Sequence, residues 1–198
     1  MTATEPAAAR HMATPGEPTS FRRMDESTAE QWGVIGVETA KGQERVADRV
    51  LDLLRSLDNV TDGFICDQLT HCLQTATLAE QAGVDEEWIV ASLCHDIGKA
   101  ISVPNHPLIA AEILRPYVSD DVYNVIRTHQ DFQGRHYYHH FGGNPNAREQ
   151  YESEPWFDLG ARFADEWDQM AFDPDAETYT LEHFEPMVRN VFARAKMF

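Results

Sequence analysis

One stretch of the chain reads Ala91-Ser92-Leu93-Cys94-His95-Asp96-Ile97-Gly98-Lys99, and it ends a segment that is apolar on nearly every side. The segment follows Asp85, a residue type that commonly caps helix N-termini. Because a helix that is apolar all round belongs in a protein interior, the segment predicts a central, buried helix. Its terminal histidine and aspartate then need partners, since an unpaired buried carboxylate is very costly. The sequence therefore predicts a polar site inside the fold.

Apolar residues at helical spacing predict further helices on both sides of this segment. Before it, helices are expected over about residues 41–56 and 64–82, and Gly83 is a suitable stop for the second of them. After it, helices are expected to begin at the caps Asn105 and Ser119 and to cover about residues 157–172 and 181–196. No convincing alternating strand pattern is present. We therefore expect an all-α helical bundle.

Two segments lack this periodicity. Residues 1–30 are rich in Ala, Thr, Pro and Glu, which predicts a disordered tail and a domain spanning residues 31–198. Residues 131–155 are polar and aromatic, are interrupted by Gly, Asn and Pro, and predict a long loop. This loop either tucks its aromatic side chains against the helices or acts as a lid that begins just after His129. As a lid it would turn on the hinge Gly142-Gly143 and bring Arg135, Tyr137 or His139 to a substrate.

The composition argues against several classes of protein. A formal net charge of −17 argues against binding nucleic acid or another polyanion. No run approaches the ~18 apolar residues of a membrane span, and the N-terminus lacks an apolar leader, so a cytoplasmic protein is expected. Cys66, Cys72 and Cys94 lack the CxxC spacing and are expected to be small core residues.

Ligand-type residues recur along the expected helices. They are His71, the pair His95-Asp96, His106 and His129. A single inward histidine is more often a hydrogen-bonded core residue, but five such positions on four helices favour a site for two metal ions. Adjacent side chains on a helix diverge by about 100°, so one member of the pair can bind one ion while the other reaches between two. A further carboxylate is expected from Asp165 or Asp168, which lie at i and i+3 on one helical face.

The order of these residues, together with the stretch 91–99, resembles the HD superfamily over about residues 68–192. The resemblance implies a helical bundle around a buried metal site. In that superfamily a minimal set of one His, a His-Asp pair and one Asp holds one metal. His106 and His129 match the additional ligands of the subset that holds two. The resemblance thus implies a dinuclear site. We expect His11 and His183 to lie outside the ligand set.

Two reaction classes share this subset. One is phosphohydrolysis of a nucleotide or phosphate ester, with Mn, Co or Ni. The other is oxygenation by a mixed-valent Fe(II)/Fe(III) pair, with O2 and a small polar or anionic substrate, which gives C–C or C–P cleavage or hydroxylation. Local stretches resemble the second class, in particular a phosphonate-cleaving dioxygenase. They are Gln68–Ala76 with Ala79 and Ala82-Gly83, Trp167-Asp168 with Ala171 and Pro174, and Glu182-His183-Phe184. This resemblance implies two iron ions, Asp168 as the last ligand and Asp96 as the bridge.

Substrate contacts follow from the same resemblance and from the loop. Lys99 matches a substrate-binding lysine of myo-inositol oxygenase and, with Asp96, is expected to act in catalysis; alternatively it is a surface lysine favoured by a helix C-terminus. Gln133 stands where the phosphonate dioxygenase carries a substrate-binding lysine, and Thr61 and Phe64 stand where it carries a gating Tyr/Glu pair. These departures predict a different substrate. The residues expected to contact it are Lys99, Gln133, Arg135 and Tyr137.

Overall fold

The computed structural model describes residues 16–195, and the chain divides into two compact units, Met1–Val46 and Ala47–Phe198. The described part of the first unit contains a short 3-10 turn, η1 (Met24–Glu26), and one helix, α1 (Ala29–Gln43). Thr28 and Gln31 form a reciprocal capping box at the start of α1. The sequence did not predict α1, because its apolar residues form no clear stripe and Trp32 and Val37 remain about half exposed. Residues 1–15 of the predicted tail lie outside the described residues.

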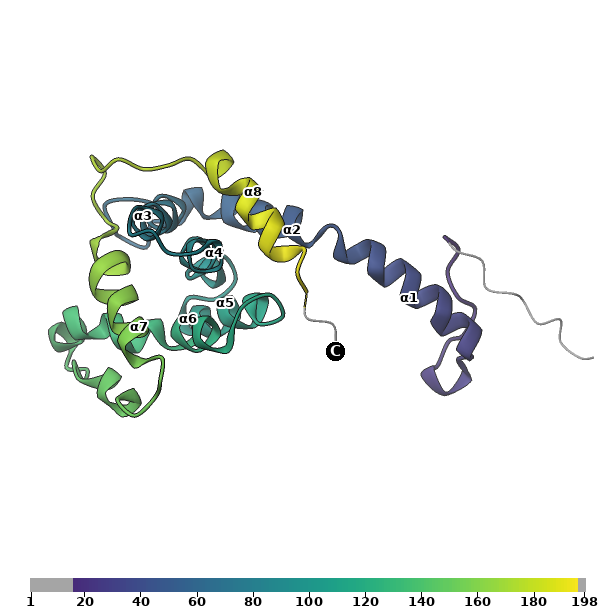
Figure 1. Ribbon diagram of the computed structural model, residues 1–198. Helices are drawn as coiled ribbons and strands as arrows, with labels where there is room; N and C mark the ends of the chain where they lie inside the picture. The colour runs from purple at the N-terminus through teal and green to yellow at the C-terminus, as the bar shows by residue number, and fades with distance from the viewer. Residues whose placement is uncertain (1–15, 196–198) are drawn as a thin grey trace, which may run out of the picture. The chain divides into compact units, whose positions relative to one another are not determined.

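The second unit is built from helices, and no strand occurs in residues 16–195, so the all-α prediction is confirmed (Figure 1). Its α-helices are α2 (Val46–Arg55), α3 (Gln68–Gln81), α4 (Glu86–Cys94), α5 (His106–Leu114), α6 (Asp120–Gln133), α7 (Phe157–Arg162) and α8 (Leu181–Phe192). Short 3-10 turns connect them: η2 (Ser56–Asn59), η3 (Ile97–Ala100), η4 (Val103–Asn105), η5 (Gly134–His136), η6 (Tyr138–Phe141), η7 (Ala147–Tyr151) and η9 (Asp168–Met170). Phe163–Trp167, labelled η8, is a π-helix.

Helix α4 is the central helix that the sequence predicts. Every residue from Ile89 to Gly98 is buried, and the side chain of Asp85 accepts the backbone N–H of Trp88 as the N-cap. Helices α3, α5, α6 and α8 pack around it, and Figure 1 shows α4 in the middle of this ring. The His95-Asp96 pair therefore lies at the buried end of the core helix.

The other predicted helix caps and buried residues agree with the structure, except for the cap at Asn105. Ser119 accepts the backbone N–H of Val122 at the start of α6, as predicted. Asn105 precedes α5, but its side chain makes no cap hydrogen bond, because the turn η4 leads directly into the helix. The three cysteines are buried and free, and α8 buries an apolar face that consists of Leu181, Phe184, Val188, Val191 and Phe192.

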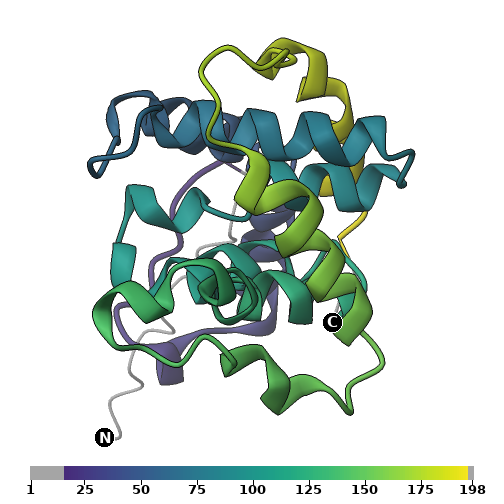
Figure 2. The same ribbon diagram turned by 90° about the vertical axis from the view of Figure 1, so that its left-hand side faces the viewer.

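The segment after α6 differs most from the prediction. Helix α6 continues to Gln133, and the expected loop then forms the three turns η5, η6 and η7. The expected single helix over 157–172 is instead α7 followed by the π-helix and the turn η9. Figure 2 shows this C-terminal segment, in light green, crossing the face of the bundle between α3 and α6, which both contact η8. The last expected ligand is thus delivered by an irregular helix.

Within residues 16–195, no helix has the length and apolar character needed to cross a membrane.

Candidate metal centre

Five elements bring the expected ligands to one place in the interior. Helix α3 supplies one histidine, and the two residues that follow α4 supply the His-Asp pair. The first residue of α5 and the C-terminal half of α6 supply one histidine each, and the residue after the π-helix supplies an aspartate. All are buried, with side chains at most 6% exposed: His71, His95, Asp96, His106, His129 and Asp168. The structure therefore brings together all six residues that the sequence singles out.

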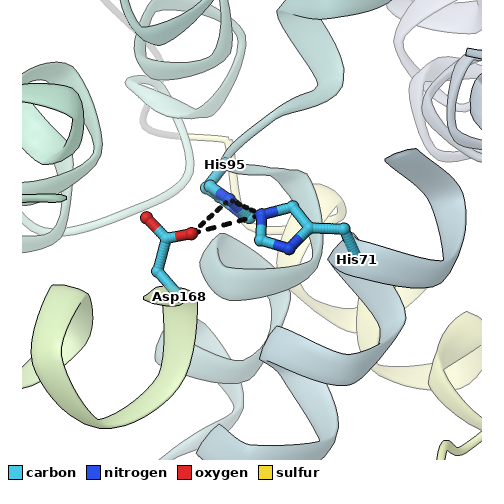
Figure 3. A group of neighbouring side chains, drawn as sticks. All are labelled: His71, His95 and Asp168. Carbon is cyan, nitrogen blue, oxygen red and sulfur yellow. Dashed lines mark hydrogen bonds and ion pairs between the residues drawn. The ribbon is translucent and has the colours of Figure 1, made fainter. Parts of the chain in front are cut away.

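His71, His95 and Asp168 form what we call the first group, drawn in Figure 3, where the three side chains point toward one another. The two Nε2 atoms lie 3.1 Å apart, and Asp168 Oδ1 lies 3.2 Å from His71 Nε2 and 3.5 Å from His95 Nε2. Three donor atoms converging in this way could hold one metal ion.

His106 and His129 form the second group. Their Nε2 atoms lie 3.3 Å apart. Asp96 Oδ1 lies 2.9 Å from the first of these atoms and 3.4 Å from the second. The other oxygen of the same carboxylate, Oδ2, lies 3.4 Å from His71 Nε2 and 3.5 Å from His95 Nε2. Asp96 thus faces both groups, one oxygen to each, which is the arrangement a bridging carboxylate requires.

The outer nitrogen of each imidazole identifies the tautomer. Every Nδ1 lies 2.7 or 2.8 Å from a backbone carbonyl oxygen, so each Nδ1 carries a proton that it donates. In a neutral ring the inward Nε2 is then an acceptor. Two such atoms at 3.1–3.3 Å cannot bond to each other, but a shared cation satisfies both. The acceptors are Ala171 O for His71, Ser92 O for His95, Val103 O for His106 and Ile126 O for His129.

Two carboxylate oxygens at the centre also lack hydrogen-bond partners. Asp96 Oδ1 and Asp168 Oδ2 are buried, and neither accepts a hydrogen bond within residues 16–195. Buried polar atoms are normally satisfied, so these two oxygens and the facing imidazole nitrogens fit a centre built for cations. Four imidazoles and two carboxylates are a donor set suited to first-row transition metals.

The electrostatics of the centre lead to the same conclusion. Burial alone would raise the pKa of Asp96 and Asp168, but the nearby His95 and the other imidazoles that face the two carboxylates outweigh it and lower both pKa values. Burial acts to lower the pKa of His95, but Asp96 and Asp168 outweigh it and raise that pKa. The carboxylates are therefore ionised, and they favour positive charge between them.

Asp165 and Asp168 do not share a face. Asp165 is bound by Arg148, whose Nη1 lies 3.0 Å from each carboxylate oxygen, and by His136 Nε2 at 2.9 Å. The prediction that both lie on one face is wrong, because a π-helix pairs residue i with i+5, which changes the angle between neighbours. Of these two aspartates, only Asp168 therefore lies among the histidines.

Lys99 and Gln133 were expected to bind the substrate. In the structure each of them contacts a candidate metal ligand. Lys99 Nζ lies 2.6 Å from Asp96 Oδ2 and donates to Gln68 Oε1 at 2.8 Å, with its side chain 12% exposed. The surface-lysine alternative is therefore wrong. Gln133 Nε2 donates to Asp168 Oδ1 at 2.7 Å. Gln68 was not expected in this network, although it precedes His71 by three residues and shares its helical face.

The other residues that were expected to contact the substrate are not among the residues of the candidate metal centre. Arg135 and His139 are exposed. Tyr137 is half-buried, and burial raises the pKa of its hydroxyl, which hydrogen-bonds to the side chain of Gln130. His183 pairs with Glu80 at 2.8 Å, away from the centre, while His11 lies outside the described residues.

The end of the expected loop tucks its aromatic side chains against α6. The ring of Tyr151 stacks on that of Phe132, and the buried Trp156 packs against both. The Tyr151 hydroxyl donates to Asp131 Oδ2 at 2.9 Å. Beside it lies a depression of about 280 Å³, lined by residues adjacent in sequence to His106 and His129 but by none of the six candidate ligands. The depression is therefore separate from the candidate metal centre.

Comparison with known proteins identifies the family of this chain. No curated protein matches the chain. The profile of the HD domain matches residues 69–173, more than half of the chain, and this span contains all six residues of the centre. Members of that family are typically metal-dependent enzymes. Because the matched span and the converged His and Asp residues coincide, we conclude that this chain belongs to the HD-domain family.

Proposed function

We propose that this protein is an O2-dependent di-iron oxygenase of the HD-domain type. Its substrate is a small polar or anionic molecule, which it cleaves at a C–C or C–P bond or hydroxylates. The observation that carries the proposal is the position of Asp96, with one carboxylate oxygen toward each of two histidine pairs. This arrangement supports two ions at one centre, and the mixed-valent oxygenases use such a pair.

Each group would hold one ion. His71, His95 and Asp168 would bind the first, His106 and His129 the second, and Asp96 would bind both. When bound, a mixed-valent iron pair supplies a Lewis acid for a substrate oxygen and a reductant for O2. With Asp96 shared, the first ion would have four protein ligands and the second would have three, so neither coordination sphere would be filled and positions would remain open for both reactants.

Aromatic rings shield the first group from water. Phe172 stacks on His71 with ring centroids 4.2 Å apart, and Phe64 stacks on Phe172 at 5.1 Å. On the other side, the buried ring of Phe163 meets His95 edge-on at 5.5 Å. The first group is buried, and exclusion of bulk water would protect an oxidation from side reactions, which supports the oxygenase proposal.

Lys99 and Gln133 would hold the carboxylate ligands. Lys99 balances part of the charge of Asp96 and fixes its Oδ2, and Gln133 fixes Asp168 by donating to Oδ1. Such outer partners orient a ligand and commonly change metal affinity by 10–100-fold when removed. We propose that these residues serve the metal ligands first, and that Lys99 also faces the substrate.

A second candidate function is a metal-dependent phosphohydrolase of a nucleotide or phosphate ester, with Mn, Co or Ni. Membership of the HD-domain family favours it. Two bridged ions also stabilise both the attacking and the leaving oxygen of a phosphoryl group.

Metal analysis and spectroscopy of the aerobically purified protein separate the two. Iron at about two ions per chain, with the EPR signal of an antiferromagnetically coupled mixed-valent pair, supports the oxygenase. A protein that takes up manganese, cobalt or nickel instead, and then releases nitrophenol from bis(nitrophenyl) phosphate, supports the hydrolase. A chain that binds no transition metal contradicts both.

A further inference from the structure

Gln68 has an amide donor with nothing to bind. The residue is fully buried at the start of α3, and its Oε1 accepts a hydrogen bond from Lys99 Nζ at 2.8 Å. A lysine ammonium can only donate, so this contact fixes which end of the amide is oxygen. The remaining end, Nε2, is buried and has no hydrogen-bond partner within residues 16–195. An unsatisfied buried amide N–H is costly, which indicates a ligand atom that it meets in the working protein.

The free N–H lies beside the candidate metal centre. Lys99 Nζ contacts both the Gln68 amide and Asp96, and it lies 2.6 Å from Asp96 Oδ2. Gln68 also precedes His71 by one helical turn. Two donors, the ammonium and the amide, thus lie next to the carboxylate that faces both groups of histidines.

This side of the centre is also the side nearer to solvent. The side chain of Lys99 is 12% exposed, more than that of any of the six candidate ligands. Its Nζ lies 5.7 Å from the ring centroid of Phe64, which is 49% exposed. A molecule that approaches past Phe64 would meet Lys99 before the histidines.

The charge of the filled centre favours an anion here. Two divalent cations together with Lys99 outweigh the two central carboxylates, Asp96 and Asp168, so the filled centre carries net positive charge. Lys99 alone, already paired with Asp96, would attract an anion only weakly.

We propose that Gln68 is a substrate-binding residue: its free amide N–H, beside the Lys99 ammonium, donates to an oxygen of a carboxylate, phosphonate or phosphate group of the substrate. The inference rests on the proposed function only for the two bound ions, not for iron or O2. It therefore assigns an anionic substrate to the centre whichever of the two reactions takes place there.

The test is to load the full chain with manganese and to measure its affinity for inorganic phosphate by titration calorimetry. Gln68→Leu keeps the volume and removes the donor. Its matched control is Gln74→Leu, because Gln74 is another buried glutamine of α3 whose Nε2 donates to the backbone oxygen of Asp173. We expect phosphate affinity to fall on the order of 10-fold in Gln68→Leu and to stay near that of the unchanged protein in Gln74→Leu, with equal manganese content in all three.

Gln68→Glu separates donation to the anion from a merely structural role. A glutamate still accepts from Lys99 and holds it in place, but it cannot donate to an anion. Affinity at least as weak as in Gln68→Leu supports the proposal, whereas recovered affinity means that Gln68 only positions Lys99 and overturns it. Equal losses in the two leucine variants, or a manganese-loaded chain that binds no phosphate, also overturn it. None of these outcomes bears on iron content or O2 use, so failure here is distinguishable from failure of the proposed function.

Discussion

Arg148 binds both carboxylate oxygens of Asp165 at 3.0 Å, and this contact ties the turn η7 to the π-helix that leads to Asp168. The side chain of Arg148 is 11% exposed, whereas that of Asp165 is 35% exposed. The pair therefore fixes the surface side of the π-helix while Gln133 fixes the residue that follows it.

Replacing Arg148 is expected to loosen the segment 147–151 and to destabilise the protein by about 1–3 kcal/mol, because the variant leaves a half-buried carboxylate without its main partner. Denaturant unfolding of Arg148→Ala measures the loss. Arg162→Ala is the control, since its pair with Glu166 is exposed and is worth about 0–1 kcal/mol. Equal losses in the two variants would show that the Arg148 contact has no special role.

Separate substitutions of the two aspartates test the ligand assignment. We expect Asp168→Ala to reduce the metal content from about two ions per chain to about one, because the first group loses its carboxylate. Asp165→Ala is expected to keep both ions, since Asp165 faces Arg148 and His136. Elemental analysis of the purified variants gives the answer, and the reverse pattern would make Asp165 the ligand.

Gly98 controls the position of His106. A Cβ added at Gly98 would overlap the carbonyl oxygen of His106 and lie 2.7 Å from its Cα. We expect Gly98→Ala to cost about 1–3 kcal/mol of stability through overpacking and to displace His106 from the second group, with loss of one ion.

Gly33→Ala is the control for this substitution, because nothing lies within 4 Å of a Cβ at that position of α1. An alanine in an exposed helix is expected to be neutral or stabilising. Normal stability and metal content in Gly98→Ala would mean that the backbone there yields easily.

The hydroxyl of Tyr151 is expected to make the free energy of unfolding depend on pH, with stability lost at high pH. Burial, followed by the hydrogen bond to Asp131, raises its pKa to about 12, above the value of about 10 in an unfolded chain. A raised folded pKa means that the stabilisation is fully present below about pH 10 and is lost as the pH rises through 12. The difference in unfolding free energy between the unchanged protein and Tyr151→Phe should shrink over that interval. A difference that is constant between pH 8 and 12 would contradict this assignment.

The sequence predicted the all-α fold and the residues that meet at the centre for a simple reason. A histidine or aspartate on an apolar helix face has few outcomes besides burial with a partner, so His129 and the His95-Asp96 pair could be placed from the pattern alone. Helix α4 could be placed in the middle because it is apolar all round.

Other features depend on contacts between distant residues and could not be predicted in this way. Helical periodicity does not distinguish Asp165 from Asp168, and only the resemblance of the stretch around Trp167-Asp168 favoured Asp168. The π-helix that separates their directions is held by Arg148 and by packing on α3 and α6. The role of Gln68 depends on Lys99, which is 31 residues away. The turns η5–η7 carry no periodicity, and α1 has no apolar stripe for a pattern to detect.

The carbonyl acceptors of the imidazole rings imply an order of assembly during synthesis. His95, His106 and His129 each bond to the residue three positions earlier, so their rings are oriented as soon as their own turns form. His71 instead bonds to Ala171, 100 residues later. A chain emerging from the ribosome can therefore complete the His106–His129 pair while the partner of His71 is still to be translated. We therefore expect an ion held between those two histidines to bind before an ion held at the other position.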